Sequence, residues 1–246
     1  QRGPGGNAVR QFVKVDAPVV AITHVRVIDG TGAPAREDQT LIIRAGNIAA
    51  LGPAATVAVP EGATVVDGTG KSVIPGLVMV HEHLYYPTGP GVYGQLGQSF
   101  VRLYLAGGVT TMRTGGNVNG VMDITLKQKI ERGELAGPAI DATAPYLEGP
   151  NTQGQMHALT DDADARRQVA YWAEMGATSF KAYMNITKAE LGAAIEEAHK
   201  RNLKLTGRRM IGDVECYVLQ SERPLDYAYS YESGGRKVDY GYVGQR

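Results

Sequence analysis

Two histidines separated by a single residue, His81 and His83, end an apolar run that starts at Val73. Side chains alternate between the two faces of a β-strand, so both imidazoles are expected to point to the same side, with Glu82 turned away. Two imidazoles on one side can bind the same metal ion. The alternative interpretation is a pair of ordinary residues at a strand end. The spacing alone predicts a candidate metal site and leaves that alternative open.

A lysine in the middle of a short strand-like run is the second residue that can carry chemistry. Lys181 stands at the centre of residues 179–183, after a predicted long helix. An ammonium on an inward-facing strand position is unfavourable unless it pairs, loses its proton or is chemically modified. A neutral lysine amine can add carbon dioxide and form a carbamate, whose two oxygens can bridge two metal ions. A surface-facing lysine on an edge strand is the alternative.

Four further residues are candidates for contact with a substrate. Arg113 ends a predicted strand beside two glycines, where a guanidinium can hold a carboxylate; a structural hydrogen bond to the loop is the alternative. Tyr85 and His157 lie on predicted loops that follow strands, where binding residues are common. Tyr183, two places after Lys181, shares its predicted face and either contacts substrate or packs. Other residues on such loops are Tyr86, Asn117 and Tyr146.

The composition narrows the classes of partner. The chain has 246 residues, 43% of them hydrophobic, which is enough for a large α/β domain with a small additional unit. Its 25 basic and 25 acidic residues balance, so we expect neither nucleic acid nor a membrane as a partner. The apolar runs are too short to span a bilayer. Cys216 is the single cysteine, which excludes a disulfide within one chain.

The elements that must position these residues fall into two groups. Three β-type runs, at 19–28, 41–50 and 64–66, are separated by glycine-rich turns and predict a small antiparallel unit. Afterwards apolar strands alternate with helices, which is typical of parallel βα units. The predicted strands of this second part cover residues 73–80, 109–113, 139–142, 179–183 and 203–206.

Capping residues predict where two of the helices begin. Thr160 can cap a helix whose first turn holds Asp161 and Asp162, at the positive end of the helix dipole. Thr187 and Glu190 have the spacing of a capping box. Successive βα units predict a doubly wound sheet or part of a (β/α)8 barrel, and in both the loops after the strands carry the chemistry.

The ordered set of motifs resembles the amidohydrolase superfamily. The run 75–78 leads into the two histidines, 107–113 reads Gly-Gly-Val-Thr-Thr-Met-Arg, and 178–183 contains the lysine. The resemblance covers roughly residues 19–207 and is greatest to the imidazolonepropionase-related and Xaa-Pro dipeptidase-like members. It implies an α/β fold: a distorted, TIM-like (β/α)8 barrel, here incomplete, with a small N-terminal β-sandwich annex. The expected organisation is a leader (1–16), the annex (17–72), barrel units one to five (73–207) and an atypical tail of unknown structure (208–246).

The resemblance also implies a metal centre with one or two divalent ions, usually zinc. His81 and His83 match the ligands of the first strand, and Lys181 matches the carboxylated lysine that bridges the metals and serves catalysis. Water activated by the metal would attack the C–N bond of a small amide, dipeptide or N-acyl amino acid. Histidine and carbamate ligands also suit manganese, cobalt or iron.

The sequence departs from the superfamily pattern after the fifth predicted strand. Arg208 stands where a histidine is expected, and no histidine follows His199. The aspartates of the tail, Asp213, Asp226 and Asp239, follow no recognisable eighth strand. Two alternatives to an active hydrolase therefore stay open. One is a non-catalytic remnant or interaction module of the same fold without a complete metal centre; the other is a tail that does not reflect the native gene.

The beginning of the chain bears on localisation. It starts at Gln1, without methionine, and has a glycine-rich stretch without periodicity. This suits removal of a signal peptide, which would make the protein periplasmic or secreted; otherwise we expect it in the cytoplasm. Because relatives assemble, a homo-oligomer is the default expectation.

Overall fold

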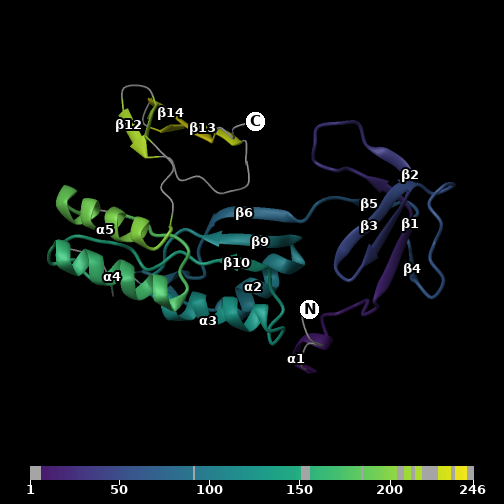
Figure 1. Cartoon of the computed structure of the whole chain (residues 1–246), viewed down its shortest axis with the longest axis horizontal. Helices are drawn as coiled ribbons and strands as arrows, with labels where there is room; N and C mark the ends of the chain where they lie inside the picture. Colours follow the sequence, from purple (N-terminus) through teal and green to yellow (C-terminus); the bar gives the residue numbers. More distant parts are fainter. Residues whose placement is uncertain are drawn as a thin grey trace. The chain divides into compact units, whose positions relative to one another are not determined.

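The structure is a computed structural model that describes residues 7–90, 92–150, 156–183 and 185–203, and the backbone of 208–211, 214–217, 227–233 and 236–242 (Figure 1). The chain divides into two compact units, Gln1–Ala142 and Thr143–Arg246. Within the described ranges no helix is both long and apolar enough to cross a membrane. The domain boundaries expected from the sequence stay a prediction.

The first unit begins with the short helix α1 (Asn7–Arg10) and a five-stranded sheet. Its strands are β1 (Val19–Val27), β2 (Arg36–Arg44), β3 (Asn47–Pro53), β4 (Thr64–Asp67) and β5 (Ser72–Val73). The order is β3-β2-β1-β4, and β5 also pairs with β1. The antiparallel prediction is confirmed for β1, β2 and β3. It is wrong for β4, which pairs parallel with β1; β5, outside the predicted runs, also pairs parallel with β1.

A tight turn divides the predicted run 41–50 into two strands. Ala45 and Gly46 both have positive φ, 48° and 78°, so the chain reverses there and β3 returns along β2. Ala21, Leu41 and Ile42 lie buried on the sheet. The prediction of β-structure is confirmed for this run, which the turn at Ala45 and Gly46 divides between β2 and β3.

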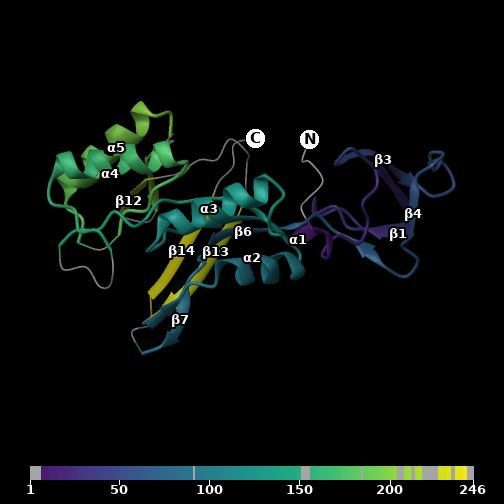
Figure 2. The same cartoon turned by 90° about the horizontal axis from the view of Figure 1, so that it is seen from below.

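A second, parallel sheet carries the histidines. Its strands are β6 (Leu77–Glu82), β9 (Val109–Thr114) and β10 (Ala139–Asp141), in the order β10-β9-β6. The helices α2 (Gly97–Ala106) and α3 (Gly120–Glu131) pack against β9 and β10 and lie side by side, as Figures 1 and 2 show. A small hairpin, β7 (Tyr86–Gly89) and β8 (Val92–Gly94), connects β6 to α2.

Strand β6 differs from its prediction in two respects. It begins at Leu77 rather than Val73, because Pro75 has no N–H to donate to a neighbouring strand. Its apolar side chains are not buried as expected: Leu77 is 49% exposed and Val78 is 46% exposed. Of the strands that the structure describes, only β9 pairs with β6, so β6 is an edge strand there.

The second unit contains the two longest helices, α4 (Asp162–Met175) and α5 (Lys188–Lys200), which pack on each other (Figure 1). Phe180 and Ile186 pack against the core of this unit. That core consists of Leu147, Leu159, Ala165, Val169, Ala193 and Ala194.

The capping predictions have different outcomes. The capping box at the start of α5 is confirmed: Glu190 N donates to Thr187 Oγ1 (3.2 Å), and Thr187 N donates to a carboxylate oxygen of Glu190 (2.8 Å). The predicted cap of α4 is wrong by one residue. Asp161 is the N-cap and accepts from Asp164 N at 2.6 Å. Thr160 lies one residue before the cap, and its backbone N–H donates to the Asp164 carboxylate at 3.2 Å.

The predicted strand 179–183 pairs only intermittently. It forms isolated parallel bridges to residues 143 and 147, and Leu147 N donates to Lys181 O at 2.9 Å. A continuous ladder is prevented because Pro145, in the partner segment, has no backbone N–H to donate.

The predicted strand 203–206 lies outside the described residues except for Leu203. In the tail, two hairpins are described: β11 (Arg208–Ile211) with β12 (Val214–Tyr217), and β13 (Tyr227–Ser233) with β14 (Arg236–Tyr242).

Candidate metal-binding site

The two predicted histidine ligands lie next to each other at the end of β6. His81 is the second-last residue of β6, and His83 follows directly after Glu82, the last residue of the strand. Their ring centroids are 5.2 Å apart, with the ring planes inclined by 75°. Leu84, which comes next, is fully buried and fixes the chain in place just beyond the pair. The structure therefore brings together two imidazoles, as alternation along a strand predicts.

The loop that follows β9 supports both imidazole rings. Gly116 O accepts a hydrogen bond from His83 Nδ1 at 2.9 Å. A carbonyl can only accept, so Nδ1 carries the proton, and in the neutral ring Nε2 keeps its lone pair for a metal. Gly115 lies against the other ring: a Cβ there would come within 2.3 Å of His81 Nε2. Two consecutive glycine positions thus fix the orientation of one imidazole and leave room for the other.

This loop is attached at both of its ends. Gly115 N donates to Glu82 O at 2.7 Å, which continues the pairing of β9 with β6. Asn117 Nδ2 donates to Asp123 Oδ2 at 3.0 Å, and both residues are at most 2% exposed. Burial raises the pKa of Asp123 to about 6, although hydrogen bonds from Asn117 and Thr114 oppose this shift. The second attachment is therefore a buried polar cluster on the first turns of α3.

Glu82 occupies the position between the two histidines and faces the helix side. It accepts a hydrogen bond from His83 N at 2.9 Å and another from the Tyr86 hydroxyl. The Tyr86 hydroxyl also contacts the Tyr104 hydroxyl of α2. Burial and the hydrogen bond to Glu82 raise the pKa of Tyr86, although the bond with Tyr104 opposes this shift; burial and the bonds with Tyr86 and Glu82 raise the pKa of Tyr104. Both hydroxyls consequently stay protonated and remain donors beside the carboxylate.

Two of the predicted substrate-contacting residues belong to the same unit. The ring of Tyr85 lies 5.0 Å from the ring of His83 and 5.7 Å from that of Tyr93. Arg113 is half-buried on β9, in register with Asp141 of β10. Tyr85 is thus adjacent to the imidazole pair, and the guanidinium of Arg113 comes from the strand that leads into the supporting loop.

Lys181 and Tyr183 belong to the second unit, where an aromatic pair surrounds the lysine. The Lys181 Nζ atom lies 5.4 Å from the ring centroid of Tyr146 and 5.5 Å from that of Tyr183. The two tyrosine rings are 4.5 Å apart. Aromatic faces attract cations, so this arrangement stabilises the charged ammonium. Carbamate formation, in contrast, requires the neutral amine.

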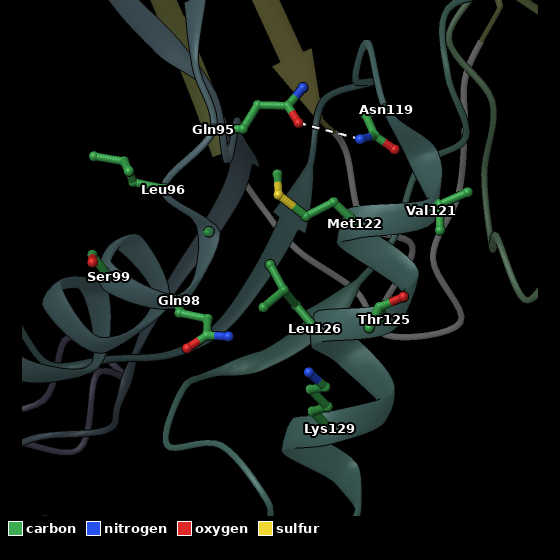
Figure 3. Close-up of a pocket in the computed structure, with 11 residues that line it drawn as sticks. Gln95, Leu96, Gln98, Ser99, Asn119, Val121, Met122, Thr125, Leu126 and Lys129 are labelled. Atoms are coloured by element: carbon green, nitrogen blue, oxygen red, sulfur yellow. Dashed lines mark hydrogen bonds between the residues drawn. The ribbon is translucent and has the colours of Figure 1, made fainter.

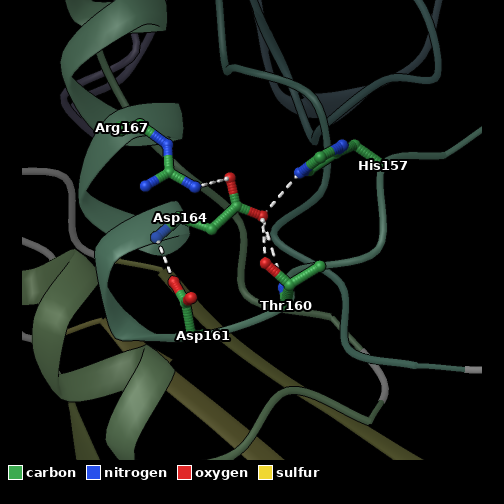
Figure 4. Close-up of polar contacts among 5 residues, drawn as sticks. All are labelled: His157, Thr160, Asp161, Asp164 and Arg167. Atoms are coloured by element: carbon green, nitrogen blue, oxygen red, sulfur yellow. Dashed lines mark hydrogen bonds and ion pairs between the residues drawn. The ribbon is translucent and has the colours of Figure 1, made fainter.

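His157, the fourth predicted substrate-contacting residue, is engaged with the start of α4 (Figure 4). Its Nε2 lies 2.7 Å from Asp164 Oδ2, and the same carboxylate contacts Thr160 N and the Arg167 guanidinium, both at 3.2 Å. Burial works against ionisation of Asp164, but the hydrogen bonds from His157 and Thr160 outweigh it and lower the pKa of this carboxyl. The role of His157 toward a substrate stays a prediction.

The donor set fits a metal in part. Two neighbouring imidazoles, one with its proton held on Nδ1, are the arrangement that metal-binding histidines adopt. Catalytic zinc sites use three protein ligands. Within the part of the chain that the structure describes, no group of three or more histidine, cysteine, aspartate or glutamate side chains could hold an ion. The side chains of Arg208 and of the three aspartates in the tail lie outside that part.

A cavity of about 550 Å³ opens elsewhere in the first unit, between the starts of α2 and α3 (Figure 3). Asn119 Nδ2 donates to Gln95 Oε1 across it at 3.3 Å, and Met122 and Leu126 line its apolar part. None of the predicted ligands or substrate-contacting residues lines this cavity. It is distinct from the histidine pair.

Sequence reasoning missed the residues that hold the histidines. The glycines at 115 and 116 were noted only as neighbours of Arg113, although two glycines directly after a strand signal a close approach of the backbone. Asp123 gave no signal, because an acidic residue near a helix start usually interacts with the dipole. Tyr104 stands in no motif that the sequence reveals, and its contact with Tyr86 forms only in the fold.

Comparisons with known proteins agree with this architecture. No family model matches the chain. An enamidase of Eubacterium barkeri is 25% identical over 186 residues, 70% of this chain and 45% of that protein. An imidazolonepropionase of Mycolicibacterium smegmatis is 28% identical over 160 residues, 61% of this chain and 37% of that protein. A solved structure described as a candidate prolidase of Bifidobacterium longum aligns with a TM-score of 0.60 and 26% identity, covering 74% of this chain and 47% of the other.

The chain is related to the amidohydrolase superfamily, and over the aligned part it has the α/β fold of that superfamily's TIM barrel. The predicted resemblance and fold class are confirmed. The chain spans less than half the length of these relatives.

Proposed function

We propose that the protein is a metal-dependent amidohydrolase that cleaves a C–N bond of the amide or peptide type in a small molecule. The observation that carries the proposal is the pair of adjacent imidazoles at the end of β6, with the His83 Nδ1 proton held by Gly116 O. The relationship to enamidase and imidazolonepropionase supports the reaction class. A dipeptide or an N-acyl amino acid is the proposed substrate.

His81 and His83 would hold one divalent ion, and a carbamate on Lys181 is the proposed third ligand, able to bridge to a second ion. Zinc is the first choice of metal, with manganese, cobalt and iron as alternatives. When bound, such an ion lowers the pKa of a coordinated water and polarises the substrate carbonyl. The chain itself fixes the tautomer of His83, and it keeps Glu82 turned away through Tyr86.

The proposed substrate contacts follow from the chemistry of the side chains. The ring of Tyr85 lies beside that of His83 and would border the bound substrate. Arg113 would pair with a substrate carboxylate, a bond that a guanidinium makes with two parallel donors. Tyr183 and His157 are proposed contacts from the second unit. We propose a small molecule as the only partner class besides further copies of this chain, in a homo-oligomer.

The test measures metal content and turnover together. The purified 246-residue chain is loaded with Zn²⁺, dialysed, and analysed for bound metal, then assayed on Xaa-Pro dipeptides and N-acyl amino acids. We expect one or two ions per chain, turnover, and loss of both in the H81A/H83A double variant. Retention of less than one ion without turnover would contradict the proposal and favour the non-catalytic interaction module.

A further inference from the structure

We propose that Asp123 and Asn117 are positioning residues for the two imidazoles: their buried hydrogen bond fixes the loop 114–117, whose backbone orients both rings. The inference rests on the proposed function, because the two imidazoles are the proposed metal ligands. Its evidence is the hydrogen bonds and the burial of the loop residues. The hydrogen bond between Asp123 and Asn117 joins the loop to α3. Their effect passes through the glycines at 115 and 116.

The loop is the element that touches both rings. One of its carbonyls, Gly116 O, holds the His83 Nδ1 proton, and its Gly115 Cα lies so close to His81 that no side chain would fit. A shift of the loop would therefore change the tautomer preference of one ring and the orientation of the other. Hydrogen-bonded partners of metal-binding histidines act in this way, by fixing the nitrogen that faces the metal.

The sheet holds only the first end of the loop. Gly115 N is bonded to Glu82 O, whereas Gly116 lies beyond the last paired residue of β9. The next attachment along the chain is the Asn117 side chain, whose amide donates to Asp123. Since Gly116 stands between these two points, its carbonyl direction depends on the second one.

The Asp123 carboxylate serves the loop rather than its helix. The N-cap residue of α3, Asn119, makes no capping hydrogen bond, and Asp123 receives its bonds from Asn117 and Thr114. Both bonding partners belong to the loop, at its two ends. Burying a carboxylate there is unfavourable, as its raised pKa indicates. An uncharged side chain at this position would therefore be expected to make the folded protein more stable. A positioning role accounts for an acid at this place.

Three variants separate positioning from stability. D123L removes the acceptor and introduces a larger apolar side chain, and D123N is isosteric and keeps a carbonyl oxygen that can accept from Asn117. L126A is the matched control, because Leu126 is buried on the same helix without bonding to the loop. Two readouts are compared below the unfolding temperature: Zn²⁺ affinity by competition with a chelator, and the His83 tautomer by ¹⁵N NMR of the metal-free protein.

We expect D123L to lower Zn²⁺ affinity about 10- to 100-fold and to reduce the Nδ1–H tautomer of His83. D123N should stay close to the wild type in both readouts, and L126A should lose stability only. An unchanged tautomer and affinity in D123L would overturn the proposal, and so would an equal loss in L126A. If D123L does not fold, N117A replaces it with the same expectations. If the wild type binds no Zn²⁺, the proposed function fails, and the tautomer still decides on positioning.

Discussion

At the scale of single residues, Gly115 tests whether space beside His81 matters. A Cβ at this position would lie 2.2 Å from His81 Cδ2, far inside van der Waals contact, so G115A must displace the ring or the loop. We expect Zn²⁺ affinity, measured by chelator competition, to fall at least about tenfold.

The control for this variant is G192A in α5. Nothing lies within 4 Å of a Cβ at Gly192, so alanine should stabilise the helix by about 0.5–1 kcal/mol. Its metal affinity should equal that of the wild type. Equal affinities in G115A and G192A would show that the space beside His81 is not needed.

Asp123 should give the protein a distinctive pH dependence. Its pKa is raised from 3.8 to about 6 in the fold, so the native state binds the proton more tightly than the unfolded chain. The stabilisation that it contributes is present below pH 3.8 and is lost as the pH rises through about 6. Relative to D123N, the wild type should lose up to about 3 kcal/mol of unfolding free energy over this range, measured by urea denaturation. Parallel pH profiles for the two proteins would contradict this assignment.

His157 has a structural contact and a predicted substrate role, and one variant separates them. The ring is 51% exposed and bonded to the nearly buried Asp164 carboxylate. H157A should lower the unfolding free energy by at most about 1 kcal/mol, as is usual for partly exposed pairs. A raised KM at unchanged stability would instead show that the ring contacts substrate.

At the scale of elements, the 179–183 segment determines the state of Lys181. The rings of Tyr146 and Tyr183 favour the ammonium, whereas the proposed ligand is the anionic carbamate. We expect a carbamate signal in ¹³C NMR after incubation with ¹³C-bicarbonate and Zn²⁺. K181R keeps a cation beside both rings but cannot add carbon dioxide, so it should keep its stability and lose the signal and the turnover. Turnover in K181R would exclude the carbamate.

Local sequence patterns predict which helices and strands form more accurately than they predict the residues where these elements begin and end. The capping box at Thr187 involves residues three apart, so sequence alone identifies it. The predicted start of α4 is wrong by one residue because threonine and aspartate are both good caps, and the sequence does not show which side chain Asp164 N reaches in the fold. The parallel pairing of β4 with β1 joins residues more than forty apart, which no local pattern encodes.

In the candidate site, too, local spacing is predictable from the sequence, whereas contacts between distant residues are not. The spacing of His81 and His83 suffices to predict that the rings are neighbours. The residues that hold them come from the loop after β9 and from α3, and their contacts form only when the chain folds. Sequence reasoning therefore found the proposed ligands and missed Gly115 and Asp123, which orient them in the structure.

At the scale of the whole molecule, the proposed metal site couples metal binding to folding, because only the native protein brings the two histidines together. An ion bound by the native protein and not by the unfolded chain stabilises it by about 2.7 kcal/mol at one hundred times the Kd. Zn²⁺ should thus raise the melting temperature measured by calorimetry, and a chelator should reverse the effect. The H81A/H83A variant should show neither change. A Zn²⁺ effect of equal size in that variant would place the ion elsewhere.

The most direct test of the central claim is X-ray absorption spectroscopy of the zinc-loaded chain. If His81 and His83 bind the ion, the spectrum should contain two imidazole nitrogens at about 2.0–2.1 Å together with oxygen ligands. In H81A/H83A the imidazole contribution should disappear. A wild-type spectrum without imidazole, or one that both proteins share, would contradict the account.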